Sequence, residues 1–466
     1  MKFRRLPFLF LAGWMLLNPA GKAAPAGAEA LLIVTGDQHS AYDRTAQFVA
    51  LVDRLKAENP GLPLAVLLDG DTLEYGNVLA RRTHGAVDFA ELAALARRAP
   101  TILNLGNHEP EFYDLAATVE RVKATGVTVV TNITNRATGR PFAPASTLLP
   151  LGRQTAVVVG LTTDHLSTYR VAVRPSLDLA DPVVWARANF PKLLATDPGP
   201  ASPRPATTGQ PALNIVLSHA GLSADRALLP LVPDGTLFAG AHDHLRFVQP
   251  FGRTVYFHSG AWNEYVSLAW LCRNATGAPR WVVEQERVPG EGPGDPEMAV
   301  FLAKTRAENL TAADRAVIGR IPAGLTPPDA ARFAARALRE AAGADAAFIG
   351  NTTFGGGLPA GNVTQLDFDA CVRFDGAVFT TEVDGTRLAR LLAAANEGPD
   401  TPFDRRRGEF NFADGPASID PARRYRIATT DWGAKNSARY FGEPALTWQE
   451  KPGLKLKEAV QQALQK

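Results

Sequence analysis

Cysteine is scarce in this sequence, with only two residues among 466. That count excludes a disulfide-rich scaffold and a zinc site built from thiolates. An excess of one charge sign is also lacking, because 49 Lys and Arg residues face 47 Asp and Glu residues. The near-balance gives no reason to expect nucleic acid or an anionic membrane as a partner. The 46% hydrophobic content is ample for a packed core, which excludes disorder, collagen and coiled coil for the chain as a whole.

Long hydrophobic runs are lacking after the first thirty residues. A basic start at 2–5 precedes an apolar run over 6–17, and small residues follow. This order predicts a secretory signal over 1–28, and the run is too short to span a bilayer easily. We therefore expect a secreted or periplasmic protein without a stable membrane anchor. In such a compartment Cys272 and Cys371 would either pair or stay as buried thiols.

Short apolar runs alternate with longer amphipathic stretches over residues 29–287. Runs such as LLIVT (31–35) and NIVLS (214–218) suit strands buried on both faces, and several stretches between the runs have helical spacing. This alternation predicts an α/β layered domain. The Pro- and Gly-rich residues 288–297 predict a linker, and mixed helix and strand patterns over 298–466 predict a second, α+β domain.

Polar residues follow five of these runs at the point where each run ends. Ligands bind at the carboxyl ends of strands in open α/β sheets, so the five endings are expected to converge. Asp, His and Asn without thiolates suit Mn, Zn, Fe or Co. They are too many for one four-coordinate ion, whereas a pair of ions roughly 3.5–4 Å apart uses them naturally. The endings are GDQH (36–39), DGD (69–71), GNHE (106–109), SH (218–219) and GAHDH (240–244).

In this order and spacing the five motifs resemble those of the calcineurin-like metallophosphoesterases, and more closely those of the secreted 5′-nucleotidase family. The resemblance continues in the second half, where ADAAFIGN, LPAGNVT and FDGAVFTTEVDGTRLARLL are similar to that family's C-terminal domain. It implies a layered β-sandwich catalytic domain flanked by helices and a smaller α+β substrate domain. It also implies an enzyme that uses two divalent ions to release phosphate from a small phosphoester, here a nucleotide.

The resemblance further implies two sets of metal ligands that share one carboxylate. The first set comprises Asp37, His39 and His244. The second set comprises Asn107, His219 and His242. Asp71 would bridge the two ions, and His108 would be the catalytic histidine that stabilises the transition state or protonates the leaving alkoxide.

The carboxylate that orients the catalytic histidine departs from the family pattern. The family motif reads GNHEFD, whereas residues 106–114 read GNHEPEFYD. Glu111 stands where the aspartate is expected, and Asp114 is the alternative if an insertion has moved the role. We favour Glu111 on its position.

The second domain departs further from the family. The segment N-x-G-x-x-R reads NTTFGGG (351–357), so the expected arginine is absent and Gly356 lies near its place. Glycine cannot replace a bidentate guanidinium clamp. Arg373, Lys435 and Arg439 are the candidates to supply the missing charge.

Two aromatic positions do match the family's base-stacking pair. Phe374 and Trp432 would sandwich a base, each stack contributing roughly 1–3 kcal/mol, or else would fill the core of the small domain. Asn107 would also contact the substrate. Asn351 would donate to the ribose or base, or else serve as a turn residue.

Because the family's arginine is missing, substrates other than nucleotides are also candidates. The main alternative is the same metal site acting on a cyclic or non-nucleotide phosphoester or on a sulfur ester. A nucleotide-binding protein without turnover is a minor alternative, because it requires a damaged metal set and the set is complete. The sequence does not indicate the oligomeric state.

Overall fold

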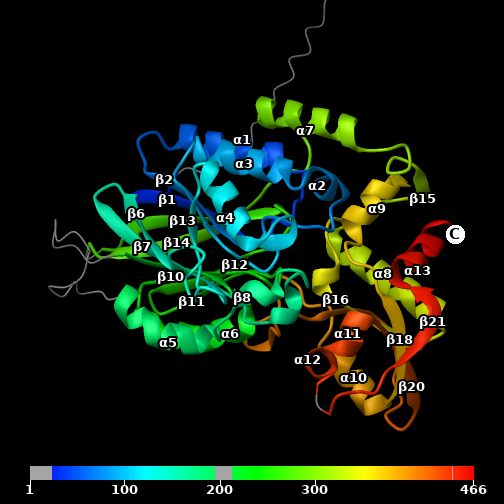
Figure 1. Cartoon of the computed structure of the whole chain (residues 1–466). Helices are drawn as coiled ribbons and strands as arrows, with labels where there is room; N and C mark the ends of the chain where they lie inside the picture. The colour runs from blue at the N-terminus through cyan, green and yellow to red at the C-terminus, as the bar shows by residue number, and fades with distance from the viewer. Residues whose placement is uncertain (1–23, 195–212, 276, 443) are drawn as a thin grey trace, which may run out of the picture.

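The computed structural model describes residues 24–194, 213–275, 277–442 and 444–466. Residues 1–23 of the predicted signal segment therefore lie outside the described residues. Within the described ranges, no helix is both long enough and apolar enough to cross a bilayer. The chain forms a larger lobe from its first part and a smaller lobe from its last part (Figure 1).

Two six-stranded sheets form the centre of the larger lobe. The first has the order β14-β13-β1-β2-β3-β4, and its strands are β14 (Pro279–Arg287), β13 (Tyr265–Arg273), β1 (Ala28–Thr35), β2 (Leu64–Asp69), β3 (Thr101–Asn104) and β4 (Thr128–Val130). The second has the order β11-β12-β10-β9-β7-β6, and its strands are β11 (Arg246–Phe251), β12 (Thr254–Ser259), β10 (Leu237–Gly240), β9 (Leu213–His219), β7 (Gln154–Thr162) and β6 (Ser146–Leu151). In each sheet four neighbouring strands run parallel, which brings their carboxyl ends to one edge.

Strand β1 shows why the sequence runs are apolar throughout. Leu32 and Val34 point between the sheets, where they join a core with residues of β7, β9 and β10. Leu31 and Ile33 point the other way, toward the helices. Successive side chains of a strand face opposite sides, so a strand covered on both sides is apolar at every position.

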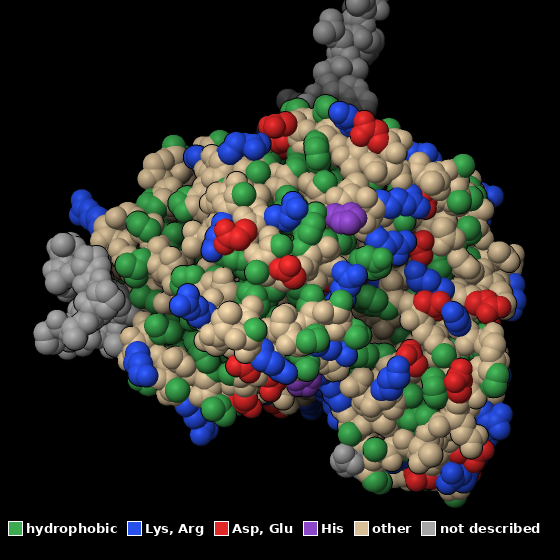
Figure 2. Space-filling view, in the orientation of Figure 1, with side chains coloured by type: hydrophobic (Ala, Val, Ile, Leu, Met, Phe, Trp, Pro, Cys, Tyr) green, Lys and Arg blue, Asp and Glu red, His purple; other side chains and the backbone are tan. Residues whose placement is uncertain are grey.

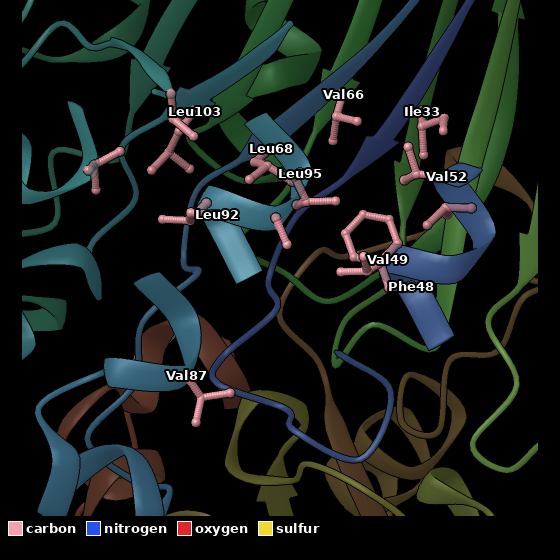
Figure 3. Close-up of a cluster of buried hydrophobic side chains, with 14 of the residues drawn as sticks. Ile33, Phe48, Val49, Val52, Val66, Leu68, Val87, Leu92, Leu95 and Leu103 are labelled. Atoms are coloured by element: carbon pink, nitrogen blue, oxygen red, sulfur yellow. The ribbon is translucent and has the colours of Figure 1, made fainter. Parts of the chain in front are cut away.

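Helices cover the outer faces of both sheets. Phe48 and Val49 of one helix and Leu92 and Leu95 of another pack against Ile33 and its neighbours (Figure 3). The helices near the first sheet are α1 (Thr45–Glu58), α2 (Val78–Thr83), α3 (Ala86–Ala96) and α4 (Leu115–Ala124). The second sheet carries α5 (Pro182–Leu193) and α6 (Leu222–Leu228). The predicted layered β-sandwich flanked by helices is thus confirmed.

The smaller lobe is an α+β unit, as predicted. Its five-stranded sheet has the order β19-β16-β20-β18-β21, with strands β19 (Asn411–Asp414), β16 (Ala346–Gly350), β20 (Arg424–Thr430), β18 (Ala377–Asp384) and β21 (Gln449–Lys455). A two-stranded sheet pairs β15 (Val317–Ile321) with β17 (Gly361–Thr364). The helices are α8 (Pro327–Ala342), α9 (Gln365–Cys371), α10 (Gly385–Ala393), α11 (Asp431–Lys435), α12 (Ser437–Phe441) and α13 (Leu456–Leu464).

Helix α7 (Pro296–Asn309) connects the lobes and packs on the larger one. Met298 and Leu302 belong to the same core as α1 and the first sheet, and the helix lies beside α1, α2 and α3 (Figure 1). The sequence prediction began the second domain at residue 298. The packing of α7 favours a boundary after Asn309 instead. Cys272 and Cys371 are both buried free thiols, in separate cores.

Candidate metal centre

Five turns meet where the parallel strands of the two sheets end. The turns after β1, β2 and β3 come from the first sheet, and those after β9 and β10 come from the second. Backbone hydrogen bonds tie neighbouring turns together, since Asp37 N donates to Gly70 O at 3.0 Å and His39 N donates to Asp71 O at 2.8 Å. The predicted convergence of the five sequence motifs at one sheet edge is therefore seen directly.

The donor residues occupy an unusual backbone conformation. Five of them have positive φ, namely Asp37 (51°), His39 (50°), Asp71 (53°), His242 (79°) and His244 (56°). Such conformations cost non-glycine residues on the order of 1–3 kcal/mol each and persist only where surrounding structure imposes them. Gly70, at φ 76°, has a different reason, because a Cβ there would lie 2.6 Å from Nδ1 of His219. The turns therefore keep the donor residues in strained backbone conformations, and these conformations place their side chains at the centre.

The first donor group contains Asp37, His39 and His244, whose ligand atoms lie within 4.8 Å of one another. Nε2 of His39 and Nε2 of His244 are only 2.8 Å apart. Burial lowers the pKa of His39 well below its ordinary value, and that of His244 to about 3. Both imidazoles are therefore neutral, with lone pairs available to an ion.

The second donor group contains Asp71, His219 and His242, with the oxygen of Asn107 beside them. Nδ1 of His242 lies 2.9 Å from Oδ1 of Asn107. Nδ1 of His219 contacts the backbone oxygen of Asp69 at 2.7 Å. That contact takes the Nδ1 proton and leaves Nε2 of His219 directed at the group, toward Asp71.

Asp71 lies between the two groups. Its Oδ2 is 3.0 Å from Nε2 of His219 and 3.9 Å from Nε2 of His39. Burial raises the pKa of this carboxyl, but His219 and His108 outweigh burial and hold the pKa well below its usual range. An ionised carboxylate between two groups of imidazole, carboxyl and amide donors fits divalent cations, so the residues present suit the predicted ions.

His108 stands beside this centre with a carboxylate of its own. Oε1 of Glu111 lies 2.8 Å from Nδ1 of His108. Burial lowers the pKa of His108, yet Asp71 and Glu111 outweigh it and raise that pKa to about 10. Asp114, the alternative partner, caps α4 by accepting from Ala117 N at 2.8 Å. The structure thus brings Glu111, and not Asp114, to the histidine.

Glu109, a buried acid beside the centre, has no role predicted from the sequence. Glu109 accepts from the backbone N–H groups of Gly106 at 2.6 Å, Asp71 at 3.1 Å and Thr72 at 2.7 Å. It therefore ties the DGD turn to the GNHE turn. Its place inside the GNHE motif was the only available signal.

The smaller lobe reaches the centre from two sides. Arg373 is buried, and its guanidinium pairs with Glu74 at 3.0 Å, donates to His39 O and lies 4.5 Å from the ring of Trp262. On the other side, Oε1 of Glu409 lies 3.7 Å from Nε2 of His242.

Glu409 is held in place by its own lobe. Its Oε2 accepts from the hydroxyl of Tyr440 at 2.6 Å and pairs with Arg439 at 3.1 Å. Contacts between residues so far apart in the chain leave no local sequence pattern.

A cleft of about 690 Å³ lies over the centre and between the lobes. Asn107, Phe374 and Trp432, proposed from the sequence as substrate residues, are among the residues that line it. Asn351 does not. Its amide nitrogen donates to Asp243 O at 2.9 Å and its oxygen accepts from Phe410 N at 3.1 Å, so it joins the two lobes away from the cleft.

The three candidates for the missing arginine are all paired with carboxylates. Arg373 lines the cleft but is held by Glu74. Lys435 pairs with Asp431 at 2.9 Å, and Arg439 pairs with Glu409 as described above. Neither Lys435 nor Arg439 is among the residues that line the cleft.

A double β-sheet layer with helices outside it, and a His, Asp and Asn donor set at the sheet edge, define a metal-dependent hydrolase. Residues 30–246 match the family model for the calcineurin-like phosphoesterase, and residues 325–408 match that for the 5′-nucleotidase C-terminal domain. The chain therefore carries a calcineurin-like phosphoesterase domain followed by a 5′-nucleotidase C-terminal domain, as its motifs predicted. The family uses divalent metal ions on small phosphoesters, and the chain is accordingly a hydrolase.

Solved structures share the fold over nearly the whole chain. A 5′-nucleotidase precursor of Thermus thermophilus is 18% identical with a TM-score of 0.61, covering 93% of this chain and 96% of that one. The sulfate thiohydrolase SoxB of Thermus thermophilus is 16% identical with a TM-score of 0.63, covering 95% of each. The 5′-nucleotidase of Candida albicans is 13% identical with a TM-score of 0.62, covering 95% of this chain and 98% of that one. No curated protein matches the sequence.

Proposed function

We propose that the chain is a secreted or periplasmic hydrolase that uses two divalent ions to release phosphate from a nucleotide. The observation that carries this proposal is the position of Asp71, whose Oδ2 faces His219 of one donor group and His39 of the other. One shared carboxylate between two groups of donor side chains is the arrangement that a pair of ions requires.

Each residue then has a role in that reaction. Asp37, His39 and His244 would hold one ion. Asn107, His219 and His242 would hold the other, with Asp71 between them. When bound, the ions supply the Lewis acidity that activates water and neutralises charge on the phosphoryl group.

His108 moves the proton. With Glu111 at 2.8 Å from Nδ1, the imidazole is held as a cation whose Nε2 can protonate the leaving alkoxide. Asn107 would orient the phosphoryl group from the same turn. The cleft residues Phe374 and Trp432 offer aromatic faces on which a base of the leaving group would stack.

The experiment loads the purified protein with Mn or Zn and screens AMP, 2′,3′-cyclic AMP, UDP-glucose, simple sugar phosphates and a cysteine S-sulfate. We expect AMP to give a higher kcat/KM than the cyclic nucleotide, the sugar phosphates and the sulfur compound. His219→Asn should abolish turnover, while His84→Asn, at an exposed position with φ 52° that asparagine tolerates, should not. Highest activity on the sulfur compound would replace the nucleotide proposal, and full activity of His219→Asn would overturn the metal mechanism.

A further inference from the structure

Three arginines line the cleft without a carboxylate partner. Arg81 lies on α2, and Arg170 and Arg174 follow the short helix Leu166–Thr168. Among the residues that the structure describes, no Asp or Glu oxygen lies within 4.0 Å of any of the three. The other two basic residues of the cleft differ, since Arg373 pairs with Glu74 and Lys457 pairs with Asp369 at 2.6 Å. The free positive charge of the cleft therefore belongs to the larger lobe.

Two of these arginines are arranged around one aromatic ring. The guanidinium carbons of Arg81 and Arg170 lie 5.4 Å and 5.5 Å from the ring centre of Tyr75. A guanidinium that lies against an aromatic ring keeps its N–H groups available for an anion. We call Arg81, Tyr75 and Arg170 the arginine–tyrosine cluster. Basic side chains are visible around the hollow between the lobes (Figure 2).

The cluster is attached to the carboxylate that partners the catalytic histidine. Arg170 donates to the backbone oxygen of Glu111, and the backbone N–H of Tyr75 donates to its carboxylate. The same carboxylate lies 2.8 Å from His108. An anion on the cluster would thus sit next to the place where a leaving group is protonated, rather than on the donor groups.

Arg174 is not part of the arginine–tyrosine cluster, but it stabilises the segment that carries Arg170. Its guanidinium donates to the backbone oxygens of Tyr169 and Ser167, each at 2.8 Å. These two bonds hold the segment 166–174 in a defined shape. Arg170 is itself exposed, and these bonds stabilise the segment that carries it.

We propose that the arginine–tyrosine cluster binds a second anionic group, carried by the leaving group of the substrate. The preferred substrates would be phosphoesters with a further phosphoryl group close to the scissile one, such as nucleoside diphosphates. This inference rests on the proposed function and names its substrate class. It also accounts for the absence of the family's arginine in the smaller lobe, because arginines of the larger lobe would supply the positive charge.

The test compares two substrates and two product-like anions. ADP presents an anionic leaving group, whereas p-nitrophenyl phosphate presents one without a phosphoryl group. Pyrophosphate would span the donor groups and the cluster, whereas orthophosphate would occupy the donor groups alone. The variants are Arg81→Met, Arg170→Met and their combination. Arg187→Met of α5 is the matched control, because Arg187 is exposed and does not line the cleft.

Loss of charge-assisted hydrogen bonds to a phosphoryl group is expected to cost roughly tenfold to a hundredfold in binding. In the double variant, kcat/KM for ADP should fall at least about tenfold more than that for p-nitrophenyl phosphate. The affinity for pyrophosphate, measured by calorimetry on the Mn-loaded protein, should fall about tenfold more than that for orthophosphate. Arg187→Met should change none of these ratios.

The outcomes separate the two proposals. Equal losses for both substrates, or no loss for either, overturn the role of the cluster while leaving the hydrolase intact. A wild-type protein that hydrolyses no phosphoester overturns the proposed function. Calorimetry still decides on the cluster in that case, since an unchanged ratio of pyrophosphate to orthophosphate affinity overturns it without reference to turnover.

Discussion

The buried ion pair between the lobes gives a prediction about stability. Replacing Arg373 by Met removes the guanidinium that pairs with Glu74 at 3.0 Å, donates to His39 O and lies against Trp262. The Glu74 side chain is 0% exposed and the Arg373 side chain 2% exposed, so water cannot replace the lost partner. Breaking a buried pair from one side costs about 3–5 kcal/mol, whereas a surface pair contributes about 0–1 kcal/mol.

The control is an ion pair on the protein surface. Arg253 and Asp234 meet at 2.7 Å with side chains 57% and 56% exposed. Urea unfolding at fixed Mn concentration, followed by tryptophan fluorescence, should show a loss of about 3–5 kcal/mol for Arg373→Met and less than about 1 kcal/mol for Arg253→Met. Adding Glu74→Gln to Arg373→Met should recover part of the loss, because no uncompensated charge remains. The reasoning is refuted if the two arginine variants cost the same.

Four further outcomes are expected at the centre and beside it. Chelation with EDTA should abolish hydrolysis and lower the Tm, and Mn should restore both, because an ion that binds only the folded chain stabilises it. Asp71→Asn should lower the bound metal, measured by elemental analysis, and reduce kcat at least about a thousandfold. Glu111→Gln should lower kcat by roughly 10- to 100-fold at unchanged metal content, because His108 loses its carboxylate. Asp114→Ala should instead leave kcat unchanged and cost about 1 kcal/mol of stability, as the loss of a helix cap does.

The sequence predicted the architecture well because the relevant signals are local. The apolar runs that become β1, β2, β3, β9 and β10 are each followed within a few residues by the donors, and buried parallel strands leave little freedom for either. Glu111 could be preferred over Asp114 for the same reason, since position within one turn decides which carboxylate reaches His108.

What the sequence could not predict depends on contacts between distant segments. Arg373 meets Glu74 across 299 positions of the chain, and no periodicity records such a pair. Asn351 looked like a substrate residue from its motif, yet its amide is used to join the lobes. Helix α7 has no marked apolar side, and only the packed structure shows which lobe it covers.

The two contacts from the smaller lobe have a consequence for metal supply. Arg373 touches the residue His39 of one donor group, and Glu409 lies beside His242 of the other. If docking of that lobe strengthens the hold on the ions, thermodynamic reciprocity requires the ions to strengthen docking by the same factor. Starvation for metal would then loosen the lobes, and a substrate that contacts both lobes would slow the escape of the ions.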